Sequence, residues 1–151
     1  MNVSSCMKRN VVSIPANATV QHAVELAVKY HIGTLPVVDK EGKLLGIVNL
    51  KGLLSLVMPD FVQLIDNIDF LSDFGAVEKR RPSDEDLHHI VHDIMEKPIC
   101  VKENSSLLHA AAMLSKHILK DIPVITEDGI LIGLVSHVDI GTALMETWKL
   151  V

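Results

Sequence analysis

The chain repeats itself, and this internal repeat limits the folds open to the sequence more than any other feature. Leu35-Pro-Val-Val and Ile122-Pro-Val-Ile place their prolines 87 positions apart. Glycines and small apolar residues recur at the same offset, in the pairs Ala23 and Ala110, Gly42 and Gly129, Gly46 and Gly133, and Val48 and Val135. Each repeat has only about 50 residues, too few to bury a stable core alone. The two halves are therefore expected to pack against each other.

Each repeat predicts the same order of elements, β-α-β-β-α. A strand-forming run (11–14; 99–101) comes first, and the hydroxyls of Thr19 and Ser106 are expected to cap the helices that follow. Gly33 stands where a left-handed residue could end the first helix. The last elements are two strands around a glycine turn (35–39 and 43–49; 122–126 and 130–136) and a closing helix (50–58; 138–148). Met7 and Met95 open the repeats and are expected in the core.

These elements predict a mixed α/β fold of the α+β type. Two β-α-β-β-α repeats pack with pseudo-twofold symmetry and leave clefts between them. The first repeat covers residues 1–58, a helical insertion covers 59–93, and the second repeat covers 94–151.

The insertion is too apolar for a simple linker. Its first part predicts an amphipathic helix, with apolar residues at Phe61, Leu64, Ile65, Ile68 and Leu71. Ser83 is expected to cap a second helix, which carries Leu87, Ile90, Val91 and Ile94. His88 and His92 share a face of that helix, but zinc requires a third or fourth ligand. A solvated or partner-facing helix is therefore favoured over a metal site.

Composition excludes several classes of function. The chain has 14 Lys and Arg against 19 Asp and Glu, so no surplus of cations is available for a nucleic-acid backbone. No apolar run approaches the roughly 20 residues that span a bilayer, and no secretory signal is recognised. Cys6 and Cys100 are expected to be reduced thiols, and the cytoplasm is the expected location. Phosphate-binding loops and nucleophile elbows are missing, so no enzymatic activity and no obligatory cofactor are expected.

The repeated pattern Leu35-Pro-Val-Val-Asp39-x-x-Gly42-x-Leu-x-Gly46-Ile-Val48 resembles the CBS domain, and two such domains in tandem resemble the Bateman module. The resemblance implies two clefts between the repeats that hold adenosine compounds, such as AMP, ADP, ATP or S-adenosylmethionine. It also implies pairing of two modules into a flat disk and no catalysis by the module itself. A homodimer is expected as well from the apolar helix faces and from Phe61, Phe70 and Phe74 in the insertion.

In nucleotide-binding members of this family, the segment after the last strand reads Ser/Thr-x-x-Asp. Its carboxylate can accept hydrogen bonds from the ribose hydroxyls, and its hydroxyl can contact phosphate. The second repeat has this motif as Ser136-His-Val-Asp139, whereas the first has Asn49-Leu-Lys-Gly52. Gly52 cannot hold a ribose, so the first site is expected to be weak, empty or used differently.

The family's layout implies that other residues complete the Ser136 site. Lys8, Val11 and Val12 would contact adenine, and Ile32, Gly33 and Thr34 would line the opposite wall. The second repeat would add Leu134 and Lys120, the lysine directed towards phosphate.

Two functions are consistent with these features. The first is a regulatory module that senses cellular energy or metabolite state through an adenine nucleotide and acts on a separate partner protein. The alternative is a ligand-free scaffold, in which Ser136 and Asp139 only cap a helix and the insertion mediates assembly.

Overall fold

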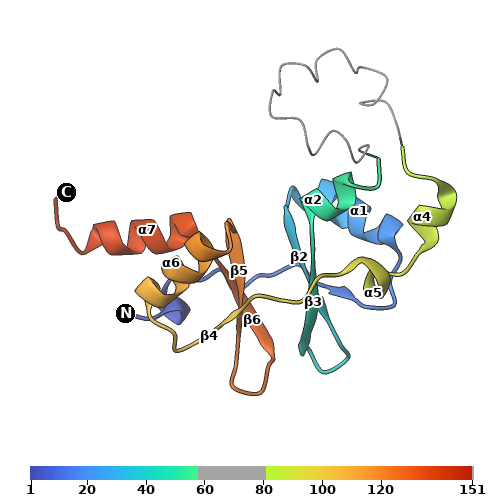
Figure 1. Cartoon of the computed structure of the whole chain (residues 1–151). Coiled ribbons are helices and arrows are strands. Elements are labelled where there is room, and N and C mark those ends of the chain that lie inside the picture. The colour runs from blue at the N-terminus through green and yellow to red at the C-terminus, as the bar shows by residue number, and fades with distance from the viewer. Residues whose placement is uncertain (58–80, 151) are drawn as a thin grey trace, which may run out of the picture.

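The centre of the molecule consists of two three-stranded sheets with the same topology (Figure 1). The computed structural model describes residues 1–57 and 81–150, so the amphipathic helix predicted around Phe61–Leu71, together with Phe74, lies outside the described residues. In each sheet the middle strand pairs in parallel with the first strand and antiparallel with the third. The strands are β1 (Ile14–Pro15), β2 (Thr34–Val38) and β3 (Leu44–Asn49), then β4 (Val101–Lys102), β5 (Asp121–Ile125) and β6 (Leu131–Ser136).

Each sheet carries two helices of its own repeat, which confirms the mixed α/β fold (Figure 1). These are α1 (Val20–Tyr30) and α2 (Leu50–Leu54) in the first repeat, and α6 (Leu107–Lys116) and α7 (His137–Glu146) in the second. Shorter elements are the 3-10 helix η1 (Val3–Ser5) and the helices α4 (Asp84–His88) and α5 (Val91–Ile94). None of the described helices is long and apolar enough to cross a membrane.

The predicted caps begin the first helix of each repeat. Thr19 Oγ1 accepts a hydrogen bond from the backbone N–H of His22 at 3.1 Å, and Ser106 Oγ accepts one from His109 at 3.0 Å. Such a bond satisfies one of the N–H groups that a helix start leaves free. Both capping predictions are confirmed.

The prediction that Gly33 ends α1 is wrong. His31 instead adopts the left-handed conformation, with φ 54°, and Ile118 does the same at the equivalent position of the second repeat. This conformation lets the N–H of Ile32 reach back to the carbonyl of Ala27 at 3.2 Å, which satisfies a free carbonyl at the helix end. The helix therefore ends in a left-handed residue that is not glycine in both repeats.

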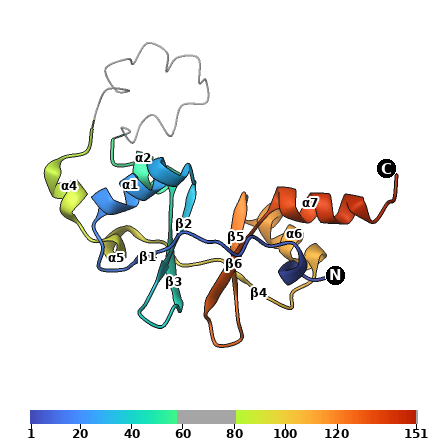
Figure 2. The same ribbon diagram turned by 180° about the vertical axis from the view of Figure 1, so that it is seen from behind.

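The glycine turns of the two hairpins form as predicted and also join the repeats. Gly42 and Gly129 have φ values of 85° and 86°, which glycine adopts without a steric penalty. The backbone N–H of Leu44 donates to the carbonyl of Gly129 at 3.0 Å, and that of Leu131 donates to Gly42 at 2.9 Å. The hairpins therefore lie side by side, as seen from front and back, and equivalent residues meet across a pseudo-twofold axis (Figures 1 and 2).

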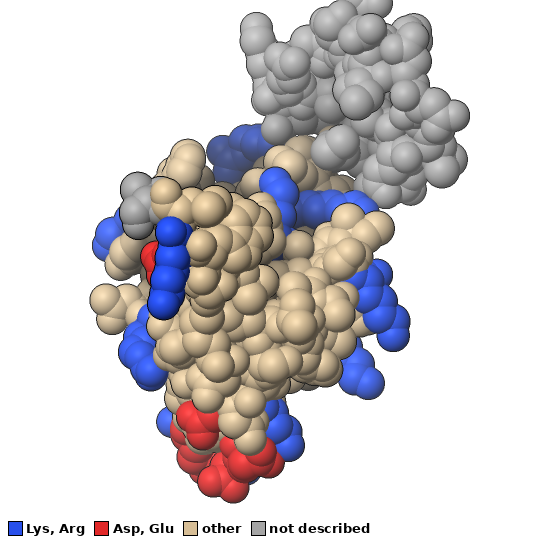
Figure 3. All heavy atoms as spheres, turned by 90° about the vertical axis from the view of Figure 1, so that its left-hand side faces the viewer, with Lys and Arg blue, Asp and Glu red and all other residues tan. Residues whose placement is uncertain are grey.

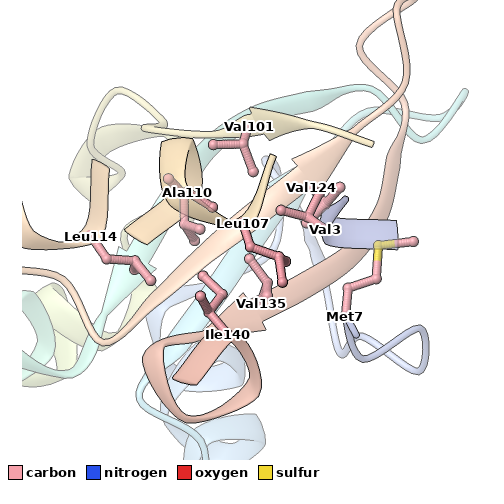
Figure 4. Packing of buried hydrophobic residues seen from close by; sticks show 10 residues of the cluster. Val3, Met7, Val101, Leu107, Ala110, Leu114, Val124, Val135 and Ile140 are labelled. Carbon is pink, nitrogen blue, oxygen red and sulfur yellow. The ribbon is translucent and has the colours of Figure 1, made fainter. Parts of the chain in front are cut away.

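The core of each repeat includes residues from the segment that leads into the other repeat. Val3 and Met7 belong to the same buried cluster as Val124 and Val135 of the second repeat (Figure 4). Conversely, Val91 is buried in the cluster of the first repeat, and Met95 packs against it. The expectation that both methionines serve the core is confirmed, but each lies in the core of the opposite repeat.

The helix predicted after Ser83 is interrupted. Ser83 caps α4 as expected, but Ile90 is extended and bridges Thr19. Three backbone hydrogen bonds hold this break, from Val20 to His89 at 2.8 Å, from Val91 to Ala18 at 2.7 Å and from His92 to Ala16 at 2.9 Å. His88 and His92 consequently lie on different helices, so the prediction that they share one helix face is wrong.

Candidate functional site

The Ser136–Asp139 motif forms a closed pair of hydrogen bonds where β6 passes into α7. Ser136 Oγ accepts from the N–H of Asp139 at 3.1 Å, and Asp139 Oδ2 accepts from the N–H of Ser136 at 2.9 Å. This capping box fixes the orientation of the carboxylate. Among the described residues Asp139 Oδ1 has no hydrogen-bond partner, so it can accept from a ligand. Capping and ligand binding are therefore compatible roles of the same side chain.

The N-terminal segment lies beside this carboxylate. The N–H of Lys8 donates to the carbonyl of Leu134 and the N–H of Leu134 to that of Lys8, both at 2.9 Å. Burial, and then the nearby Asp139 carboxylate, raise the pKa of the Cys6 thiol above its ordinary value. The structure thus brings Lys8 and Leu134 to the motif.

Thr34 approaches the same region from the first repeat. Its Oγ1 donates to Asp121 Oδ2 at 3.3 Å, and Asp121 pairs with Ser136 in the β5–β6 register. The carbonyl of the adjacent Lys120 accepts from the N–H of His137 at 3.2 Å, at the start of α7. Sequence reasoning missed Asp121, although the 87-residue offset that aligns it with Thr34 could have found it.

Other residues predicted for the site have contacts elsewhere. Val12 and Ile32 pack against the buried cluster of the first repeat, and Val11 is half-buried. The carbonyl of Gly33 accepts from the N–H of Leu50 at 2.9 Å. In the part of the chain that the structure describes, no hydrogen bond joins these four residues to Ser136 or Asp139. A role for them in ligand binding stays a prediction.

The region around Asn49, which is the equivalent of Ser136 in the first repeat, has the same backbone and different chemistry. Ile47 and Glu96 exchange backbone hydrogen bonds at 3.0 and 2.9 Å, as Leu134 and Lys8 do. Asn49 Oδ1 accepts from the N–H of Gly52 at 2.7 Å, while Asn49 Nδ2 donates to Glu96 Oε2 at 3.5 Å. A glutamate therefore stands near Asn49 where a lysine stands near Ser136.

Two apolar grooves lie on the helices, and neither is lined by Ser136 or Asp139. The larger, of about 580 Å³, lies between α1 and α2, and its lining includes Ile32 and Gly33. The smaller, of about 260 Å³, lies between α6 and α7. Eight of its lining positions match the first groove at the offset of the repeat: Ala111, Leu114, Ser115, Leu119, His137, Ile140, Gly141 and Leu144. The pseudo-symmetry thus extends to the outer faces of the helices.

The two cysteines are unlinked. Cys6 and Cys100 are both free and half-buried, and burial raises the pKa of the Cys100 thiol. Across residues 1–57 and 81–150, no group of three or more His, Cys, Asp or Glu side chains is placed to hold a metal ion.

Comparison with known proteins identifies relatives along almost the whole chain. A family model described as the CBS domain matches twice, over residues 3–59 and 91–146. The uncharacterized protein MJ1004 of Methanocaldococcus jannaschii is 28% identical over 150 residues, which cover 99% of this chain and 59% of that protein. The uncharacterized protein MJ1426 of the same organism is 27% identical over 156 residues, covering 96% and 92% of the two chains.

A solved structure with the same fold contains a nucleotide. CBSX2 from Arabidopsis thaliana, crystallised in complex with AMP, superimposes with a TM-score of 0.72 and is 26% identical. The match covers 97% of each chain. The similarity therefore extends over both repeats and their mutual arrangement.

Proposed function

The chain belongs to the CBS domain family, and on that premise we propose that it is a regulatory binding module whose Ser136 cleft holds an adenine nucleotide. The observation that carries the proposal is the carboxylate of Asp139, which the capping box holds in place with Oδ1 available. A pre-oriented carboxylate loses little freedom when it accepts hydrogen bonds from a ribose.

The residues around Asp139 are suited to the phosphate and the base of an adenine nucleotide. Lys8 and Lys120 are exposed lysines whose backbones are fixed at this cleft, so their ammonium groups can balance phosphate charge. Leu134 offers apolar surface beside Lys8. The proposed ligand-binding set also includes the predicted contacts Val11, Val12, Ile32, Gly33 and Thr34.

AMP is the first ligand to test, because the related CBSX2 was crystallised with it. ADP, ATP and S-adenosylmethionine share the adenosine group and are the other candidates. The chain spans 59% of the length of MJ1004, so its relatives include longer proteins in which such a module is one part. We further propose that ligand binding acts on a separate partner protein, with no catalysis by this chain.

AMP is expected to raise the melting temperature of the protein. A ligand that binds only the folded state stabilises it by about 2.7 kcal/mol when its concentration is 100 times Kd. The measurement is thermal unfolding with AMP, with GMP and inorganic phosphate as controls for the base and for the charge. If none of the four adenosine compounds shifts the transition, the ligand-free scaffold becomes the better account.

The helix grooves support a homodimer as the functional assembly. Large apolar side chains on these helices remain exposed within one chain, including Val28 (75%), Leu54 (47%) and Met145 (49%). The side of the molecule on which α6 and α7 lie has few charged side chains over its centre (Figure 3). Pairing of two modules through these faces would remove that apolar area from water.

Light scattering is expected to give the mass of a dimer at micromolar concentration. Val28→Glu should shift the protein towards monomer, because Val28 is 75% exposed and lines the groove between α1 and α2, where a buried charge is costly. Leu45→Glu is the matched control, since Leu45 is 39% exposed on β3 and lines neither groove. A monomeric wild-type protein, or equal dissociation of both variants, would contradict this assembly.

A further inference from the structure

The surface around Ser136, Asp139 and Lys8 (the Ser136 cleft) and the surface around Asn49, Gly52 and Glu96 (the Asn49 cleft) share a backbone framework but differ in charge at one position. Lys8 and Glu96 are related by the pseudo-twofold axis, because each exchanges two backbone hydrogen bonds with equivalent residues of β6 and β3. Both side chains therefore start from matching positions beside the helix start of their cleft. The Ser136 cleft has a cation there, and the Asn49 cleft has an anion.

The exposed side chain of Glu96 reaches the residue that caps α2. Asn49, the equivalent of Ser136, donates from Nδ2 to Glu96 Oε2 at 3.5 Å. The other polar group of Asn49, Oδ1, is already used by the N–H of Gly52. Glu96 thus engages one of the two hydrogens of this amide, and it adds a negative charge beside the start of α2.

We propose that Glu96 is a specificity-determining residue that keeps phosphate-bearing ligands out of the Asn49 cleft and so confines AMP to the Ser136 cleft. This inference rests on the proposed function. The physical reason is Coulomb repulsion, which acts on phosphate and hardly on an uncharged nucleoside. Gly52 removes the ribose acceptor as well, so two independent differences disfavour AMP in this cleft.

The first experiment places a glutamate in the Ser136 cleft, at the position of Lys8, which is equivalent to that of Glu96. Lys8→Glu is expected to weaken AMP binding about tenfold, because a charge of opposite sign then faces the phosphate. Adenosine carries no phosphate, so its affinity should change by less than threefold. Lys8 is exposed and its backbone contacts do not involve the side chain, so the variant should fold. Equal losses for AMP and adenosine would show that charge at this position does not select the ligand.

The reciprocal experiment builds a second site in the Asn49 cleft. Within the described part of the chain, a Cβ added at Gly52 meets Asn49 Oδ1 alone, at 3.3 Å, so aspartate fits with a small movement of that side chain. Gly52→Asp alone should still bind one AMP per chain by calorimetric titration, because Glu96 remains. Gly52→Asp combined with Glu96→Lys should bind two.

The outcomes separate this inference from the proposed function. Two AMP molecules bound to the single variant Gly52→Asp would overturn the role of Glu96, and so would one AMP bound to the double variant. In either case, one AMP per wild-type chain still supports the proposed function. Wild-type protein that binds none of AMP, ADP, ATP and S-adenosylmethionine would instead remove the proposed function, and this inference with it.

Discussion

Replacing Asp139 with alanine is expected to weaken AMP binding about tenfold to a hundredfold, because a hydrogen bond to a charged group contributes about 1.5–3 kcal/mol. The carboxylate is the only side chain of the motif that can accept from both ribose hydroxyls. Isothermal titration of the wild type and the variant with AMP measures the change. Asp139→Asn should fall between the two, since its amide keeps one acceptor oxygen and loses the charge.

The variant must be compared with one that loses a similar cap outside the cleft. Asp139→Ala removes half of the capping box at α7, which costs about 1 kcal/mol of folding free energy. Ser106→Ala removes the cap of α6 at a similar cost and should leave AMP affinity unchanged. Unaltered AMP binding in Asp139→Ala would show that the carboxylate only caps the helix.

Gly133→Ala should be strongly destabilising, by about 2–3 kcal/mol, which is at the upper end of what overpacking costs. A Cβ at this position would lie 2.5 Å from the sulfur of Met7 and 3.0 Å from the carbonyl oxygen of Lys8. Met7 is buried, and the carbonyl oxygen of Lys8 accepts a hydrogen bond from the N–H of Leu134, so neither group can move away freely. Denaturant unfolding measures the loss, and AMP affinity should fall too, because Lys8 belongs to the cleft.

Gly141→Ala is the matched control for this substitution. Gly141 lies within α7, and no atom of residues 1–57 or 81–150, its helix neighbours aside, lies within 4 Å of the position that its Cβ would take. Alanine favours helix over glycine by about 1 kcal/mol, so this variant should be as stable as the wild type or more so. A Gly133→Ala protein as stable as Gly141→Ala would mean that the N-terminal segment is not tightly packed against β6.

Local features of the fold were predictable from the sequence because they depend on neighbouring residues. Thr19, Ser106 and Ser83 cap their helices, and Gly42 and Gly129 form their turns, since each needs only a side chain or a φ value within a few residues. The repeat itself predicted that the two halves pack around a pseudo-twofold axis.

Features that depend on distant residues were not predictable in this way. The break between α4 and α5 exists because Ile90 pairs with Thr19, a residue far away in the sequence. The sequence around Met7 and Met95 does not show that each packs in the core of the opposite repeat, because the neighbouring residues of a buried methionine look the same in either case. Glu96 became a candidate only when the pseudo-twofold axis related it to Lys8 and placed it beside Asn49.

The crossing of the N-terminal segment gives the Ser136 cleft a mechanical property. Met7 is anchored in the core of the second repeat, whereas Val12 packs against the core of the first. The few residues between them form a strap that connects the two cores, and Lys8 lies on this strap beside the cleft. A ligand that contacts Lys8 and Asp139 therefore restrains the strap and the start of α7 together. If such a ligand binds, the stiffness of one repeat relative to the other would depend on its occupancy, without a change of conformation within either repeat.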